Sequence, residues 1–303
     1  MICPPYLKIG DSVAIVAPAR KISAEDISEG IDILRSWGLN VVLSENLLCS
    51  SNQFAGTDEQ RADDFQKAIN DSNIKAIFCA RGGYGSIRII DKIDFSPLIS
   101  SPKWIIGFSD ITVFHSKLNS IGIESIHAPV ITTLKNAPSE VQNKLKDALF
   151  GKQLKLNFPQ NNSLNIVGEC TGELIGGNLS ILYSLLGSEA DIDFSNKILF
   201  LEDLDEYLYH IDRMMMCLKR AGKLSNLKAL IVGDVSKMND NTIPFGKSAE
   251  EIIHEHVKDY GYPLCFNFPA GHIDDNNPLI FGQKVSLRIS DDKLAAEFFN
   301  RLA

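Results

Sequence analysis

Short apolar segments alternate with longer amphipathic segments along the first half of the chain. Residues 12–19, 74–80 and 103–108 are nearly continuous apolar runs, which is typical of strands buried on both faces. Residues 23–38 and 57–69 lie between such runs and carry apolar side chains at helical spacing. This alternation predicts an α/β fold with a parallel sheet and helices on both of its faces.

Capping residues mark the starts of two predicted helices. Ser23 with Asp26, and Thr57 with Gln60, have the spacing of a capping box, in which two side chains each accept a hydrogen bond from the first helical turn. Gly38 follows the first of these segments and is expected to end it.

The pattern changes near residue 151. Residues 152–168 are polar and contain one proline and several asparagines, which indicates a linker or an edge region. Further strand and helix patterns follow, among them the apolar run at 197–203, and the chain ends in a strand-rich tail. We therefore expect an N-terminal domain at residues 1–150 and a C-terminal mixed α/β domain at residues 165–303.

Charge and composition narrow the classes of partner and compartment. The 303 residues carry a net charge of −8, which argues against nucleic acid or an anionic membrane as the main partner. Prolines and charges interrupt the first apolar segment, so no secretory signal is expected, and no run reaches the roughly 18 apolar residues of a membrane span. The six cysteines are scattered, without a Cys-x-x-Cys pair, and fit reduced thiols. A cytoplasmic protein is expected.

Ser109 lies where the apolar strand at 103–108 gives way to a helical pattern. Ligands of open parallel sheets gather at the carboxyl ends of strands, and a side chain at such a turn stands above the sheet. The stretch Gly-Phe-Ser-Asp-Ile resembles a nucleophile elbow, Gly-x-Ser-x-Gly, but lacks the second glycine. Two interpretations remain open at this point: Ser109 is a nucleophile, or it caps the following helix.

The glycine-rich stretch "ARGGYGSIR" follows the strand at 74–80. Its glycines permit the backbone to approach a ligand closely or to bind an anion. A dinucleotide fingerprint would need a third glycine where Arg88 stands, so that interpretation is weak. A tight turn without a ligand is the structural alternative.

Glu202 and His272 are the other candidates for chemistry. Glu202 ends an apolar strand and is followed by further acids, which fit either a functional site or the charged start of a helix. His272 lies in a loop bounded by proline and glycine, where it is either a base or a surface residue. The remaining histidines and acids form no zinc or calcium motif, so neither a metal nor a cofactor is predicted.

Five short motifs, taken together, resemble the LD-carboxypeptidase family. They are "ARGGYG", "IIGFSDIT", "ELIGGNLS", "LFLED" with the following "IDR", and "FPAGH", and they occur in the family's order over nearly the whole chain. The family contains serine peptidases, including cytoplasmic muramoyltetrapeptide carboxypeptidases and microcin C immunity proteins. The resemblance implies a flavodoxin-like N-terminal domain, a C-terminal domain, an active site in the cleft between them, and a homodimer.

The resemblance also assigns roles to residues. It places a catalytic triad on Ser109, Glu202 and His272, and an oxyanion hole on the backbone N–H groups of Gly83 and Asp110. The sequence departs from the family where Ile273 follows the histidine and where Ser188 replaces a common threonine. Neither position is a triad residue, so these departures bear on specificity.

The expected function is removal of the terminal D-alanine from murein tetrapeptides during cell-wall recycling. Hydrolysis of a peptidyl-nucleotide antibiotic, as in microcin C immunity, is the alternative within the family, and a non-catalytic small-molecule binding protein is the alternative outside it. Arg81 and Asn178 are expected in loops that contact the substrate.

Overall fold

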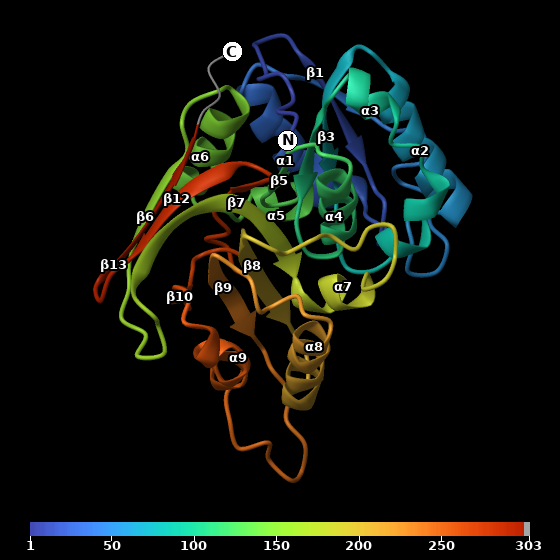
Figure 1. Ribbon diagram of the computed structural model, residues 1–303. Helices are drawn as coiled ribbons and strands as arrows, with labels where there is room; N and C mark the ends of the chain where they lie inside the picture. The colour runs from blue at the N-terminus through green and yellow to red at the C-terminus, as the bar shows by residue number, and fades with distance from the viewer. Residues whose placement is uncertain (300–303) are drawn as a thin grey trace.

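Two β-sheets organise the chain in the computed structural model, which describes residues 1–299 (Figure 1). The first sheet has the strand order β11-β5-β4-β3-β1-β2. Its strands are β1 Ser12–Val16, β2 Asn40–Leu43, β3 Ile74–Cys79, β4 Trp104–Gly107, β5 Ser125–His127 and β11 Leu279–Phe281. The five strands from the N-terminal half are parallel, as the apolar runs predict.

Helices cover both faces of the first sheet, and two separate apolar clusters lie beneath them (Figure 1). One face carries α1, α5 and α6, which contribute Leu34 and Leu149 to its core, and the other carries α2 and α4, whose Phe65 and Phe114 stack at 4.4 Å. These helices, with the short α3, are α1 Ala24–Ser36, α2 Asp58–Asn70, α3 Pro97–Ser100, α4 Thr112–Ser120, α5 Ile131–Leu134 and α6 Ser139–Leu149. The capping boxes predicted at Ser23 and Thr57 are both formed.

The second sheet is mixed and has the order β10-β9-β8-β7-β12-β13-β6. Its strands are β6 Lys155–Pro159, β7 Gly168–Asn178, β8 Lys197–Leu204, β9 Ala229–Ser236, β10 Leu264–Cys265, β12 Lys284–Ile289 and β13 Lys293–Phe298. The helices α7 Leu179–Ser184, α8 Leu208–Arg220 and α9 Ala249–Val257 share a core with β7–β10. The segment predicted as a linker or edge therefore supplies β6, an edge strand.

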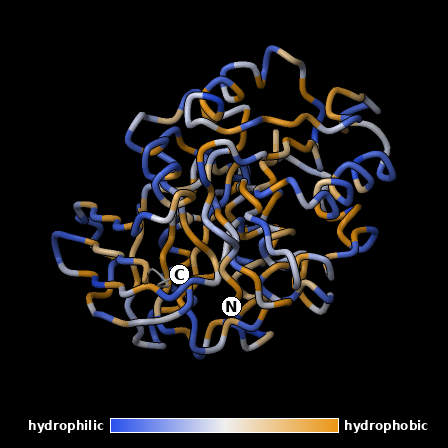
Figure 2. The backbone as a smooth tube through the Cα atoms, turned by 90° about the horizontal axis from the view of Figure 1, so that it is seen from above, coloured by the Kyte–Doolittle hydropathy of each residue, from blue (hydrophilic) through white to orange (hydrophobic). Residues whose placement is uncertain are grey.

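The two halves of the chain share a strand pairing and an apolar core, so neither sheet with its core is built from one half alone. β11 comes from the C-terminal part but pairs antiparallel with β5 of the first sheet. One apolar cluster continues from α1 and α6 into β8 and β12, and apolar segments run through the middle of the molecule in Figure 2. The domain limits 1–150 and 165–303 stay predictions, and residues 300–303 lie outside the described part of the chain.

The cysteines agree with the expectation of reduced thiols. Cys49, Cys79, Cys170, Cys217 and Cys265 are free, and Cys79 and Cys265 are buried. No helix within residues 1–299 combines the length and the apolar character needed to cross a membrane.

The end of β7 approaches its neighbours too closely for any side chain. Gly176 has φ +135°, and a Cβ atom built there would lie 1.9 Å from the carbonyl oxygen of Phe200 on β8. The next residue but one, Asn178, donates its backbone N–H to the Thr112 hydroxyl at the start of α4, at 3.0 Å. The end of β7 therefore contacts β8 of its own sheet and helix α4, which packs on the first sheet.

We predict that Gly176→Ala lowers the free energy of unfolding by at least about 3 kcal/mol, because β7 and β8 must separate to admit the methyl group. Gly187→Ala is the matched control, since Gly187 has φ +78° and open space around its α-carbon. It should lose only about 1–2 kcal/mol from backbone strain. Urea unfolding monitored by circular dichroism measures both values, and equal losses would contradict the prediction.

Candidate active site

Ser109 occupies a strained turn at the carboxyl end of β4. Its φ is +64°, a conformation that non-glycine residues adopt rarely, and it begins a 3₁₀ turn, Ser109–Ile111, that leads into α4. The N-cap positions of this turn and of α4 are Phe108 and Ile111, and neither makes a side-chain cap. The helix-cap interpretation of Ser109 is therefore wrong, and its hydroxyl is free to point elsewhere.

The three residues assigned to the triad lie in one hydrogen-bonded chain. The Ser109 hydroxyl is 3.0 Å from His272 Nε2, and His272 Nδ1 is 2.6 Å from Glu202 Oε2. Ser109 follows β4, Glu202 lies on β8, and His272 lies in the loop after β10. Residues from both sheets thus meet at the carboxyl ends of parallel strands, where the topology predicts a ligand site.

Local structure holds the histidine loop against Glu202. Gly271 has φ +121°, and a Cβ there would lie 3.1 Å from the Cβ atoms of both Glu202 and Asp234. Its N–H donates to Asn276 Oδ1 at 2.9 Å, which closes the loop on itself. A glycine at this position allows His272 to approach the Glu202 carboxylate directly.

Electrostatics favour a protonated His272. Burial alone would lower the pKa of His272, but the contact with the Glu202 carboxylate, together with Asp203 and Asp234 nearby, raises it above its usual value. Glu202 is fully buried, so its charge acts on the imidazole with little screening by water. This arrangement stabilises the imidazolium that forms when a histidine removes a proton from a hydroxyl group.

The glycine-rich loop lies directly beside Ser109. A Cβ at Gly82 would be 3.2 Å from the Ser109 Cβ, and Gly83 lines the same hollow as Ser109 and His272. Asp110, next to the serine, is buried, and its carboxylate accepts the Ser86 N–H at 2.8 Å. Gly83, Ser109 and Asp110 also line one hollow together, and an oxyanion hole on the N–H groups of Gly83 and Asp110 stays a prediction.

Two adjoining hollows flank the triad, with volumes of about 380 and 310 Å³. Arg20, Gly83, Ser109 and His272 line both of them. Arg81 and Lys135 line the first, whereas Asp203, Asp205 and Glu206 line the second. The cleft thus has a basic side and an acidic side.

Arg81 and Asn178 differ in how they meet the cleft. Arg81 lies in a loop, as predicted, and is exposed in the basic hollow. Asn178 is not in a loop: it ends β7, is buried and caps α7 by accepting the Ile181 N–H. Its amide also donates to Asp203 Oδ1 at 3.0 Å. Both hydrogen bonds lie at the point where β7 ends and α7 begins. Its side chain therefore has a structural role as the N-cap of α7, although the residue borders the acidic hollow.

Sequence reasoning missed Arg20 and Asp203. Arg20 follows the carboxyl end of β1, so the rule that places ligands at strand ends would have found it. Asp203 is buried beside Glu202, and desolvation together with the Glu202 charge raises its pKa to about 7. No pattern in the sequence distinguishes Asp203 from the other acids at and after the end of β8.

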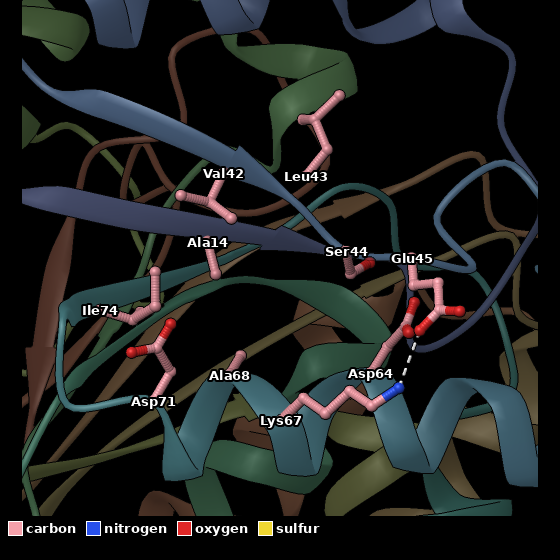
Figure 3. A pocket seen from close by; sticks show the side chains of 10 residues that line it. All are labelled: Ala14, Val42, Leu43, Ser44, Glu45, Asp64, Lys67, Ala68, Asp71 and Ile74. Atoms are coloured by element: carbon pink, nitrogen blue, oxygen red, sulfur yellow. Dashed lines mark hydrogen bonds and ion pairs between the residues drawn. The ribbon is translucent and has the colours of Figure 1, made fainter.

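Another hollow, of about 180 Å³, lies at the edge strand β2 (Figure 3). Half of the ten residues that line it are aliphatic, and Lys67 pairs with Glu45 at 2.8 Å at its rim. None of the predicted site residues lies there. Within residues 1–299 no group of three or more His, Cys, Asp or Glu side chains is arranged to hold a metal ion.

Comparison with known proteins identifies the family. The profile of the LD-carboxypeptidase N-terminal domain matches residues 13–128, and that of the C-terminal domain matches residues 171–287. A putative carboxypeptidase of Synechocystis sp. is 36% identical over 94% of this chain and 93% of its own length. A probable murein peptide carboxypeptidase of Bacillus subtilis is 32% identical over 97% of this chain and 94% of its own length.

Solved structures agree. The crystal structure of muramoyltetrapeptide carboxypeptidase from Oxalobacter formigenes superposes with a TM-score of 0.87 and 26% identity, covering 96% of this chain and all of that one. These matches extend over both sheets and confirm the resemblance predicted from the five motifs. The chain belongs to the LD-carboxypeptidase family.

Proposed function

We propose that this protein is a serine L,D-carboxypeptidase that removes the terminal D-alanine from murein tetrapeptides in the cytoplasm, as a step of cell-wall recycling. The hydrogen-bonded chain from Ser109 through His272 to Glu202, open to a cleft, carries this proposal. The names of the Bacillus and Oxalobacter relatives support a murein peptide as the substrate. We also expect a homodimer, as the family resemblance implies.

In the proposed mechanism the Ser109 hydroxyl oxygen attacks the scissile carbonyl while its proton moves to His272 Nε2. The negative charge on the carbonyl oxygen is stabilised by the backbone N–H groups of Gly83 and Asp110. His272 then donates the proton to the leaving amine, the C–N bond breaks, and an acyl-serine remains. Water hydrolyses this ester with the same histidine as base, which restores the free hydroxyl.

Glu202 acts on His272 and does not touch the substrate. Its carboxylate accepts the Nδ1 hydrogen, which fixes the tautomer and leaves Nε2 facing the serine hydroxyl. Because Glu202 is fully buried, losing its charge would leave an imidazolium without compensation in a poorly hydrated site.

We predict that Ser109→Ala lowers kcat by roughly 10⁴-fold or more, because the attacking oxygen is lost. His272→Ala should cost almost as much, Glu202→Gln somewhat less, and the triple variant scarcely more than Ser109→Ala, since triad residues act as a unit. Mass spectrometry of tripeptide and D-alanine released from a murein tetrapeptide gives the rates, with a peptidyl-adenylate as the competing substrate.

Ser120→Ala is the matched control, because Ser120 is an exposed serine at the end of α4 whose hydroxyl bonds only within its own helix. It should keep the wild-type rate, and circular dichroism should show all variants folded. Dialysis against EDTA should leave the rate unchanged. A folded Ser109→Ala protein that retains most of its activity would refute the proposed mechanism, and turnover of the peptidyl-adenylate alone would refute the proposed substrate.

The raised pKa of His272 predicts an acid limit to activity. Catalysis needs the neutral imidazole, so kcat/KM should fall as the pH drops through the pKa of His272 in the free enzyme. Glu202→Gln removes the charge that holds this pKa up, so the acid limb should move to lower pH while the plateau also falls. A pH series of kcat/KM for both proteins measures the shift, and an acid limb at the same pH in both would be the contrary result.

A further inference from the structure

Two arginines in the cleft form no ion pair with a carboxylate of residues 1–299. Arg20 and Arg81 both line the hollow that contains Ser109, and neither makes an ion pair within 4 Å among residues 1–299. Other arginines do form such pairs: Arg35, Arg61, Arg88 and Arg288. A guanidinium group is a planar fork of donors that matches a carboxylate, so two unpaired ones beside a nucleophile indicate an anionic group on the substrate.

Arg20 lies against the loop that borders the nucleophile. A Cβ at Gly83 would be 2.6 Å from Arg20 Cδ and 2.8 Å from its Nε, so the side chain rests on this glycine. The neighbouring Gly82 would in turn bring a Cβ to 3.2 Å from the Ser109 Cβ. Arg20 and Ser109 therefore contact two adjacent glycines of the same loop.

A binding site for the terminal carboxylate of the peptide must lie close to Ser109. In a carboxypeptidase substrate one residue separates the scissile carbonyl from the free carboxylate, and one residue spans at most about 3.6 Å. A group that binds this carboxylate must therefore lie next to the nucleophile. We propose that Arg20 and Arg81 bind the terminal carboxylate of the peptide and thereby confine cleavage to its last bond. This inference rests on the proposed peptidase function.

The charges of the other residues support the same direction of binding. The first hollow also contains Lys135, which pairs with Glu29. Its one acid is Asp26, whose carboxylate accepts the Ser23 N–H and is also attracted by the charges of Arg81 and Lys135. The second hollow shares Arg20 and Ser109 with the first and is lined in addition by Asp203, Asp205 and Glu206. The three acids make this hollow less favourable for a carboxylate than the first, so the leaving residue belongs on the Arg81 side and the acyl portion on the acidic side.

The test compares one tetrapeptide with a free C-terminus and the same peptide as its C-terminal amide. The wild-type protein should hydrolyse the acid at least about 100-fold faster than the amide in kcat/KM, because an amide forms no charge-assisted pair. Arg20→Gln and Arg81→Gln should each raise KM for the acid roughly 10-fold, with the amide little affected, so that discrimination falls. Arg35→Gln, a substitution of an exposed arginine on α1, should change neither rate.

Binding to a non-hydrolysing protein gives a second readout. In Ser109→Ala, calorimetry should find tighter binding of the acid than of the amide, and this difference should disappear when Arg20 and Arg81 are both replaced by glutamine. Equal affinities in Ser109→Ala, including no detectable binding of either peptide, would overturn the inference. Failure of the wild-type protein to hydrolyse either peptide would instead overturn the proposed function, so the two failures are distinguishable.

Discussion

The site depends on the contact between Glu202 and His272, at 2.6 Å, because it places a carboxylate in the interior with only one of its oxygens bonded. A buried charge of this kind is costly unless it is paired, so the arrangement requires that the β8 strand and the histidine loop dock accurately. The partner of His272, Ser109, belongs to the other sheet. Docking of the two sheets is thus a condition for the chemistry. Two contacts hold the sheets together: strand β11 pairs with β5 of the first sheet, and the Asn178 N–H donates to the Thr112 hydroxyl.

A second histidine supports this contact without taking part in it. His127 is fully buried, and desolvation lowers its pKa to about 3, so it is neutral. Its Nε2 lies 3.2 Å from Asn276 Oδ1, the same oxygen that accepts the Gly271 N–H. The ring also packs edge-on against Phe108, which precedes Ser109, and against Phe200, two residues before Glu202. A neutral His127 holds the loop in place, whereas a cation there would oppose protonation of His272.

Much of this architecture was predictable, for identifiable reasons. Strand-to-helix alternation predicts the parallel sheet, and Ser109 follows from the rule for strand ends together with the motif order. Pairing of β11 with β5 was not predictable, because a three-residue strand carries no signal for its partner. Asn178 was misplaced because the motif "GGN" has the composition of a loop, whereas close packing of β7 against β8 is what demands its glycines. Arg20 was overlooked because it belongs to no recognised motif, although it follows the carboxyl end of β1, where the rule for strand ends applies. Its significance comes from its place beside Ser109 and from the lack of an ion pair to it within 4 Å among residues 1–299.

The buried Arg61 explains how the two loops of the basic hollow keep a common position. It is 2% exposed, and its guanidinium donates to the carbonyl oxygens of Pro18 and Gly85, one in the loop that carries Arg20 and one in the loop that carries Gly83. On the opposite side of the glycine loop, the Asp110 carboxylate accepts the Ser86 N–H. The side chain of Asp110 therefore holds the glycine loop in place beside Ser109. Substrate-facing groups from three strand ends are in this way tied to one network of buried hydrogen bonds, and rigid placement of this kind is what stabilisation of a developing charge requires.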